Sequence, residues 1–477
     1  MLSDWRRAPR RGLLVIAMAV LAFEPLQGQT LTTGALGGRI LDETGASVLE
    51  ALVTVREVTA GLVHETDTGR RGVFSFVFLA PGEYELTVEQ IGFAPRRVTD
   101  IHVRQGRNQQ MTITLRAAAS SGVQQEVERF HGAVAPASLY GGSQWLPAFA
   151  LRSVPGANRE AGDVLRMASI ADDRWSVEGL PASLSVLLLD GTEFRPAAHP
   201  QLGDEGPAAA PFALTGIESA ELVTNGVAVD WSGAAASFLS AQSRRGAAGT
   251  AVHAAAFWSG DALPSSSSTG SLSHNDLQGG VVVRGPLFGD GNRFSIGVEA
   301  SRLETPLSAA WGDTDAAAAL AAGDTLGLNL DSYRESTLVS GDALAAFARA
   351  DWSAGQRHRV ELSAHFAARP NAAAVDASGS QLPYEANDLV AGGALRSRLS
   401  ADIANEVRVG VTRSVRERNA IARVTPTRLV SEDLGFGAAT VAASSADELI
   451  LRIREALHLP YGTHAIEIGG AAAVGSY

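Results

Sequence analysis

Hydrophobic and polar side chains alternate over long segments in the C-terminal half of the chain. The alternation is strict at 294–300, 357–366, 406–411 and 449–454. Segments of about ten residues with one apolar and one polar face are typical of transmembrane barrel strands. A soluble β-sandwich has the same period, because one face of each strand enters its core. We count about nine candidate strands after residue 246, and their length and pairing as hairpins favour the membrane barrel.

The connections between these strands are of two kinds. Residues 285–293 predict a short hairpin, whereas 312–331 and 371–387, rich in Asp, Ala and Gly, predict outer loops. Plugged outer-membrane barrels have about 22 strands, and open sheet edges in hydrocarbon cost several kcal/mol for each unpaired backbone group. The strand count therefore predicts either a fragment of a longer protein or a fold that is not a barrel. The pattern of the last strand, 464–470, favours the fragment.

Residues 33–116 alternate apolar and polar positions between turn signals, the pattern of a small β-sandwich. Strands are expected at 40–42 and 51–55, and alternate residues from Tyr84 to Val88 are expected to point inward. The next stretch, residues 117–150, is polar and rich in Ala, Gly and Ser, which predicts a linker.

Residues 152–246 show short strands broken by Asp-Gly and Asn-Gly turns around one brief helix, expected at 161–168. This pattern predicts a compact α+β domain. The apolar run 184–189 stops at Asp190-Gly191. Asp190 has two interpretations, a catalytic acid at a strand end or a turn residue, and the adjacent glycine favours the turn.

The chain begins with the pattern of a secretory signal peptide. A basic segment precedes an apolar run at 13–23, and cleavage is expected just ahead of Gln29. The apolar run is shorter than the roughly 20 residues that a membrane-spanning helix needs. The pattern predicts export, with a buried N-terminal helix as the alternative.

Composition removes several classes of function. A net charge of −12 and a pI near 5.4 argue against a nucleic-acid partner. Cysteine is absent, which rules out disulfides, thiolate metal sites and catalytic thiols.

We find no motif of an active site. Helical His-Glu-x-x-His spacing, a nucleophile elbow and a phosphate loop are all missing from the sequence. His358 and His365 are expected on opposite faces of one strand because their spacing is odd. The sequence therefore predicts a protein that is not an enzyme, with no catalytic residue, cofactor or metal. Arg244-Arg245 is either a site for an acidic ligand or, as we favour, the end of the α+β domain.

The order of motifs from 151 to 246 resembles the plug domain of TonB-dependent outer-membrane receptors. That family has a Val-Arg-Gly element, an apolar strand ending in Asp-Gly, an Ile-Glu-x-x-Glu-Val-x-x-Gly element, an aromatic-Gly turn and a closing Thr-Lys-x-Gly. Two positions depart from the family: Glu178 stands where arginine is usual, and 234–236 are alanines where a Gly-Gly pair is common. The matching structural residues are Val177, Gly179, Asp190, Gly191, Glu221, Gly226, Gly233, Arg244 and Gly246.

The N-terminal sandwich resembles the carboxypeptidase regulatory-like domain, a family with a carbohydrate-binding-like fold. The resemblance rests on Gly38-x-Ile40-x-Asp42-x-x-Gly45, Gly72-x-Phe74-x-Phe76 and Leu79-x-Pro81-Gly82-x-Tyr84. These are packing and turn residues, so they specify a fold and not a ligand.

Together the resemblances imply a mainly β outer-membrane receptor of an exported, Gram-negative type, embedded in outer-membrane lipid. It would take up an unidentified scarce small molecule or saccharide with energy from TonB, through ligand-binding residues that stay unknown. The expected parts are a signal peptide (1–28), a regulatory-like β-sandwich (29–116), a linker that could contact TonB (117–150), a plug domain (151–246) and a partial antiparallel barrel (247–477).

Two alternatives remain open. In such receptors a segment ahead of the plug pairs with TonB as an added strand, and here only 122–127 offers β-forming residues beside an acid. The weakness of this segment favours an adhesion or surface-assembly protein of the same architecture without active transport. A soluble periplasmic binding protein would require the strands after Ala247 to close as a sandwich.

Overall fold

The computed structural model of the chain describes the following residues: 33–105, 108–118, 126–129, 142–148, 151, 186–194, 213–225, 238–260, 275–289, 291–307, 323, 325, 337–355, 357–375, 381–400, 403–418, 429–430, 435–436, 444–461 and 464–476. The expected signal peptide, the brief helix at 161–168 and most of the expected loop 312–331 lie outside these residues. Within them, no helix is long and apolar enough to cross a membrane.

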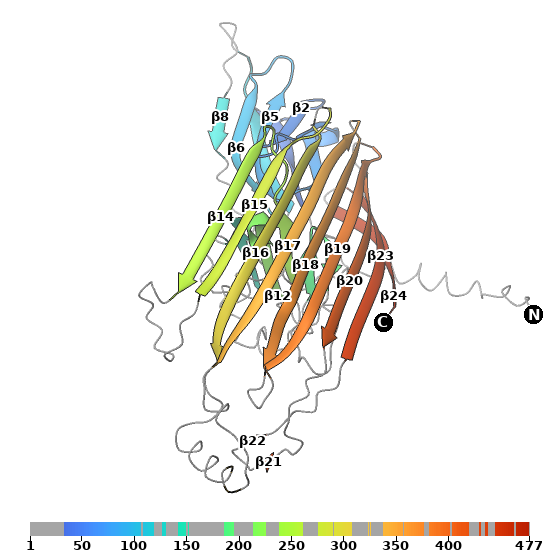
Figure 1. Cartoon of the computed structure of the whole chain (residues 1–477). Coiled ribbons are helices and arrows are strands. Elements are labelled where there is room, and N and C mark those ends of the chain that lie inside the picture. Colours follow the sequence, from blue (N-terminus) through green and yellow to red (C-terminus); the bar gives the residue numbers. More distant parts are fainter. Residues whose placement is uncertain are drawn as a thin grey trace, which may run out of the picture.

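The N-terminal unit is a β-sandwich of two sheets, called the sandwich below (Figure 1). Their inner faces share one apolar core, in which Tyr84, Leu86 and Val88 are buried, as the alternation predicted. The smaller sheet has the order β4 (Val73–Leu79), β1 (Gly34–Asp42), β7 (Asn108–Leu115). The larger has the order β3 (Val63–Asp67), β2 (Leu52–Glu57), β5 (Gly82–Glu89), β6 (Arg96–Val103), β8 (Glu126–Arg129). The short 3-10 helix η1 (Arg70–Gly72) precedes β4.

A third sheet, separate from the two of the sandwich and called the inner sheet, contains strands from three parts of the chain. Its order is β11 (Thr192–Phe194), β10 (Val186–Leu189), β13 (Phe238–Ser243), β12 (Ile217–Asn225), β9 (Gly142–Pro147), with the 3-10 helix η4 (Leu214–Gly216) leading into β12. Strands β10 and β13 are parallel, and the other pairs are antiparallel. All four residues of β10 are buried, which explains why its sequence is a continuous apolar run.

The interpretation of 117–150 as a linker is wrong for two of its segments. Strand β8 extends the larger sheet of the sandwich by parallel pairing with β6, and β9 forms an edge of the inner sheet by pairing with β12. Neither strand alternates apolar and polar residues over more than a few positions, so periodicity could not reveal them. Pairing at a sheet edge needs only backbone groups, which most sequences supply.

The C-terminal half forms one antiparallel sheet, called the wall. Nine strands of the described residues belong to it, in the order in which they follow along the chain, as the alternation predicted. Their lengths of 10 to 18 residues suffice for a tilted transmembrane strand, which needs about 9–11. The strands are β14 (Ala251–Gly260), β15 (Asn275–Pro286), β16 (Arg293–Leu307), β17 (Thr337–Ala354), β18 (His358–Val375), β19 (Gln381–Arg398), β20 (Ala404–Arg418), β23 (Ser444–Tyr461) and β24 (His464–Ser476).

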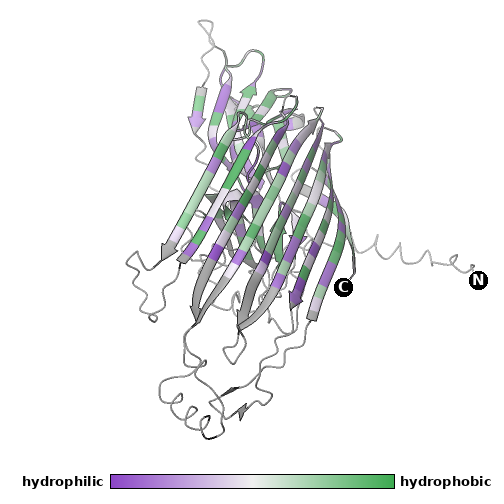
Figure 2. Ribbon diagram, in the orientation of Figure 1, coloured by the Kyte–Doolittle hydropathy of each residue, from purple (hydrophilic) through white to green (hydrophobic). Residues whose placement is uncertain are grey.

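The two faces of the wall differ in polarity, and Figure 2 shows apolar and polar residues alternating along its strands. On β18, Glu361 and His365 are buried on the concave side, whereas Leu362 and Phe366 are exposed on the other. His358 and His365 therefore lie on opposite faces, as expected. The exposed face of the wall thus carries large apolar side chains, and the concave face carries buried charged ones.

The expected outer loop 371–387 is shorter than predicted. Strand β18 continues to Val375 and β19 begins at Gln381, with Val375 paired to Gln381. The Ala-rich composition misled the prediction because hydrogen-bonded pairing, and not composition, decides where a hairpin turns. The predicted short hairpin at 285–293 is confirmed, with Pro286 paired to Arg293.

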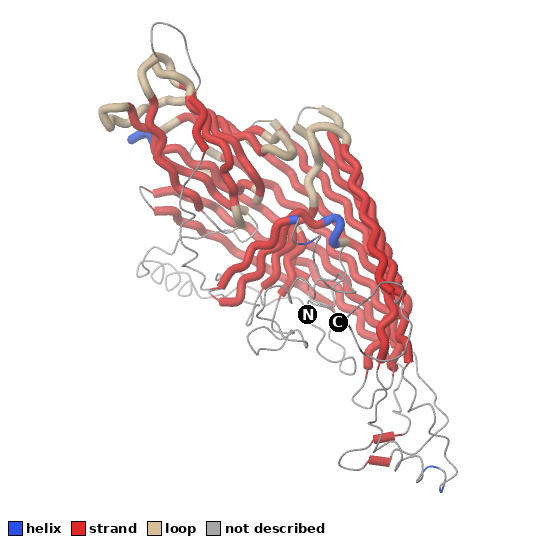
Figure 3. The backbone as a smooth tube through the Cα atoms, turned by 90° about the vertical axis from the view of Figure 1, so that its left-hand side faces the viewer, coloured by secondary structure: helices blue, strands red, loops and turns tan. Residues whose placement is uncertain are grey.

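The wall curves around the inner sheet, and the sandwich lies at one end of it (Figures 1 and 3). Val390 of β19 belongs to the same apolar cluster as the core of the inner sheet. The short turns of the wall, between β17 and β18 and between β19 and β20, lie at the sandwich end. The two-stranded sheet of β21 (Leu429–Val430) and β22 (Gly435–Phe436) lies beyond the opposite end.

Candidate functional site

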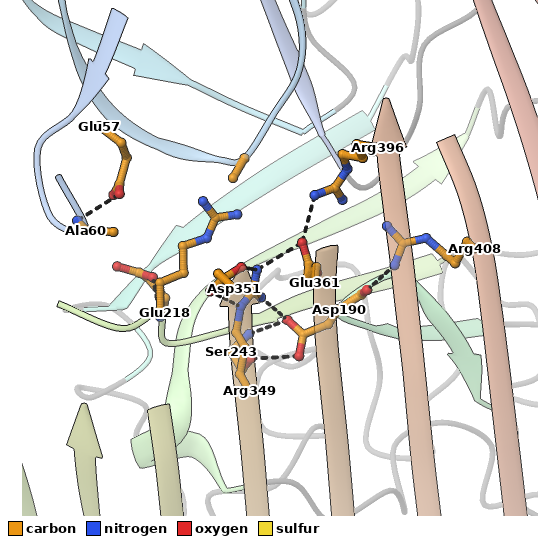
Figure 4. Close-up of polar contacts among 12 residues, drawn as sticks. Glu57, Ala60, Asp190, Glu218, Ser243, Arg349, Asp351, Glu361, Arg396 and Arg408 are labelled. Carbon is orange, nitrogen blue, oxygen red and sulfur yellow. Dashed lines mark hydrogen bonds and ion pairs between the residues drawn. The ribbon is translucent and has the colours of Figure 1, made fainter. Parts of the chain in front are cut away.

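Asp190 and Gly191 form the two-residue turn between β10 and β11, as the sequence predicted. Leu189 pairs with Thr192, and both turn residues have positive φ, +48° and +80°, which is the requirement of a type I′ turn. The sequence did not reveal what the Asp190 side chain does. It is fully buried and points toward the wall (Figure 4).

The Asp190 carboxylate accepts four hydrogen bonds. Two come from Ser243 of the inner sheet, through its backbone N–H at 2.9 Å and its hydroxyl at 2.7 Å. Two come from the wall, from Arg349 Nη1 at 2.7 Å and His365 Nε2 at 2.8 Å. Burial acts to raise the pKa of Asp190, but Arg349 and the hydrogen bond from His365 outweigh it, so the pKa lies below its ordinary value.

These contacts belong to a larger network of charged side chains on the concave face of the wall, here called the ion network. Arg349 also contacts Asp351 and Glu361, each at 3.1 Å. Arg396 bridges Glu361 and Glu406, at 2.8 and 2.7 Å. From a neighbouring strand, Arg408 donates to the main-chain oxygen of Asp190. Because each charge has an opposite neighbour, the network can stay ionised while it is buried.

A second polar contact joins the inner sheet to β15 and β16. Glu299 accepts from the backbone N–H of Thr215 at 2.8 Å and from Gln278 Nε2 at 2.7 Å. On the inner-sheet side, Arg244 Nε donates to the carbonyl of Thr215 at 2.8 Å. Arg452 reaches Glu193 of β11 at 3.2 Å, so the inner sheet has polar contacts with both halves of the wall.

Glycines on the wall and the inner sheet let the two pack closely. A Cβ at Gly392 would lie 2.1 Å from the Thr192 hydroxyl, and one at Gly410 would lie 2.8 Å from the Thr192 methyl group. On the other side, a Cβ at Gly216 would lie 2.2 Å from the ring of Phe347. Thr192 of the inner sheet therefore packs against glycines of the wall, and Phe347 of the wall packs against a glycine beside the inner sheet.

The structure brings together some of the predicted motif residues. Glu221 is buried in β12, and Arg244 and Gly246 follow β13, where the chain crosses to the wall. Arg244 and Arg245 are both buried at this crossing. Val177, Gly179, Gly226 and Gly233 lie outside the described residues.

Sequence reasoning missed Arg349, Arg408 and Glu299 as partners of the inner sheet. In the sequence these residues are recognisable only as polar positions of alternating strands. The same polar faces also contain residues that do not contact the inner sheet. In the part of the chain that the structure describes, no group of three or more His, Asp or Glu side chains is placed to hold a metal ion.

Comparisons with known proteins agree with this architecture. Residues 35–116 match the family model of the carboxypeptidase regulatory-like domain, so this resemblance is confirmed. A search of curated protein sequences finds no match.

Similar solved structures are TonB-dependent outer-membrane receptors. The siderophore receptor PirA of Acinetobacter baumannii aligns with a TM-score of 0.52 and 13% identity over 70% of this chain and 48% of that one. A mutant form of the ferric enterobactin receptor PfeA of Pseudomonas aeruginosa gives 0.51 and 12% over 70% and 49%. The outer membrane transporter YddB of Escherichia coli gives 0.50 and 10% over 70% and 48%.

The chain spans about half the length of these structures. At such identity the likeness establishes the fold, which is mainly β with an N-terminal sandwich and a receptor-like barrel wall, as predicted.

Proposed function

We propose that this chain is part of a TonB-dependent outer-membrane receptor in which the inner sheet is a plug that moves to admit a scarce ligand. The observation that carries the proposal is the ion network centred on Asp190. A buried ion pair adds little net stability compared with the same charges in water, but it fixes geometry. The inner sheet is thus held in one position by contacts that water can replace when it moves.

The ligand class follows from the similar proteins and is part of this proposal. PirA is named a siderophore receptor, and PfeA a ferric enterobactin receptor. For this chain we propose a small molecule or saccharide that meets the outer loops and the side of the plug facing away from the sandwich.

Energy from TonB could enter through β8. Val127 is 64% exposed, and β8 forms the outer edge of its sheet, so one row of its backbone groups faces away from β6. A strand of TonB could pair with that row by β-augmentation. The chain then runs from β8 to β9, an edge strand of the inner sheet. Force applied at β8 would therefore reach the inner sheet through one of its edge strands.

We expect Val127→Pro to abolish ligand uptake while surface binding of the ligand is unchanged. Proline removes the N–H at the proposed pairing site and resists the extended pairing of a strand. Uptake and binding would be measured in cells with the full-length protein, and Val127→Ala, which keeps the N–H, is the matched control. Surface levels should be normal because Val127 lies outside the core of the sandwich.

Ligand uptake that continues unchanged in Val127→Pro and in a strain lacking TonB would contradict the transport proposal. It would support the second candidate, an adhesion or surface-assembly protein of the same architecture. One observation favours that candidate: β8 is already paired with β6, with an ion pair between Arg96 and Glu128.

Localisation in the outer membrane is also part of the proposal. We expect the mature protein to be recovered from the outer-membrane fraction with an N-terminus at or near Gln29, which N-terminal sequencing would establish. Recovery from the cytosol with Met1 intact would contradict export.

A further inference from the structure

A cavity of about 350 Å³ lies between the sandwich and the end of the wall that carries the short turns. This volume falls in the range of small-molecule sites, about 300–1,000 Å³. The sandwich contributes strands β3 and β4, with Phe76 and Phe78 on one side. The wall contributes the ends of β18 and β19 and the turns beside them. The cavity is at the opposite end of the wall from the long connections, so it is separate from the proposed uptake site.

Among the residues that the structure describes, four arginines line this cavity, and one of them forms ion pairs with carboxylates. Arg396 has two carboxylate partners, in Glu361 and Glu406. Arg359 and Arg398 instead donate to main-chain oxygens of the sandwich, at Val63 and Glu65.

A carbonyl oxygen accepts a hydrogen bond from a guanidinium N–H but does not neutralise the positive charge of the arginine. Both accepting oxygens belong to β3, an edge strand of its sheet. The contacts therefore cover an open sheet edge while leaving other N–H donors of the two guanidinium groups available.

Arg357 completes the group, and its guanidinium makes no hydrogen bond or ion pair with any described residue. Within the described part of the chain, the cavity lining contains one carboxylate, that of Glu65. Three arginines without a carboxylate partner thus share a half-enclosed space with a single acid.

His64, in the sandwich, responds to this charge. Its burial and the nearby Arg359 hold its pKa well below the ordinary value, with Arg245, Arg398 and Arg396 acting in the same direction. Burial and the arginines both favour the neutral imidazole, so His64 adds no further positive charge to the cavity lining.

We propose that this cavity binds a small oxyanion with at least two negative charges, a phosphate or a carboxylate compound, through Arg357, Arg359 and Arg398. The planar guanidinium fork matches the oxygens of both groups and forms paired, charge-assisted hydrogen bonds with them. A ligand held here contacts the sandwich and the wall together and fixes one against the other.

The test is calorimetric titration of the full-length protein, folded in detergent, with pyrophosphate and in parallel with citrate, in a buffer of low ionic strength. We expect Arg357→Gln to weaken binding of the preferred anion at least about tenfold, the usual scale of one hydrogen bond to a charged group. Ser75→Glu, which adds a carboxylate to the lining, should remove binding. The matched control is Arg413→Gln, an exposed arginine paired with Asp447 outside the cavity, which should bind as the unchanged protein does.

Preference for pyrophosphate assigns the site to phosphate compounds, and preference for citrate assigns it to carboxylates. The proposal is overturned if the unchanged protein binds neither anion, or if Arg357→Gln and Arg413→Gln bind equally well. Because binding is measured on isolated protein, failure of TonB-dependent uptake would leave this result untouched.

Discussion

Asp190→Ala is expected to loosen the inner sheet from the wall and to lower the free energy of unfolding by about 3–5 kcal/mol, the cost of removing one partner from a buried ion pair. The substitution leaves Arg349 Nη1, His365 Nε2 and both donors of Ser243 without their shared acceptor. Unfolding by guanidinium chloride of the protein in detergent would measure the loss. Hydrogen exchange at β10 and β13 would show whether the inner sheet becomes mobile.

A matched control separates this effect from the loss of any ion pair. Asp447→Ala removes the carboxylate that Arg413 contacts at 2.7 Å, but both side chains are more than half exposed. Water can solvate the remaining arginine there, so no measurable change is expected. If Asp190→Ala lowers stability no more than Asp447→Ala, the ion network does not hold the inner sheet in place.

The same substitution bears on the proposed function. If the ion network keeps the plug seated, Asp190→Ala should also raise the leakage of small solutes through cells that make the protein. A destabilised but tightly seated inner sheet would instead lower the amount of protein without leakage.

The wall could be predicted from sequence because its pattern is local. Each strand has an exposed apolar face and a buried polar face, so Leu362 and Glu361 can be assigned to their faces from the alternation alone. The sandwich was predictable for the same reason, since Tyr84, Leu86 and Val88 alternate into one core.

The functional contacts could not be predicted in this way. Asp190 meets Arg349, His365 and Arg408 across 159, 175 and 218 positions of sequence. Nothing in the local pattern around any of the four residues indicates which polar side chain on the facing element will be its partner. The Asp-Gly pair correctly predicted the turn, and the same turn aims the carboxylate at the wall.

Edge strands also could not be predicted from the sequence. Strand β9 has the sequence of a loop, with Gly142, Ser143 and Gln144, yet it pairs with β12 along its whole length. The extended conformation of β9 is stabilised by the neighbouring strand and not by its own sequence. Strand β12 is already fixed by its pairing with β13, and its other side presents a row of backbone groups with which β9 can pair.

Gly246→Ala is expected to prevent the inner sheet and the wall from closing against each other. A Cβ at this position would lie 2.4 Å from the Cβ of Arg293, 2.6 Å from the backbone nitrogen of Phe294 and 2.7 Å from its carbonyl oxygen. Overpacking usually costs about 1–3 kcal/mol, and here the cost should lie at or above the top of that range because the obstructing atoms include backbone atoms of a paired strand. These short distances leave no room for a side chain at position 246.

Gly249, three residues further along the same crossing, provides the control. A Cβ at Gly249 meets no atom within 4 Å, so Gly249→Ala should leave stability unchanged to within about 0.5 kcal/mol. Both variants would be refolded in detergent and compared by the fraction that resists protease and by the midpoint of denaturant unfolding. Equal behaviour of the two would mean that the backbone of the crossing does not pack against β16 as closely as described. A loss confined to Gly246→Ala would establish that the crossing from inner sheet to wall requires a residue without a side chain.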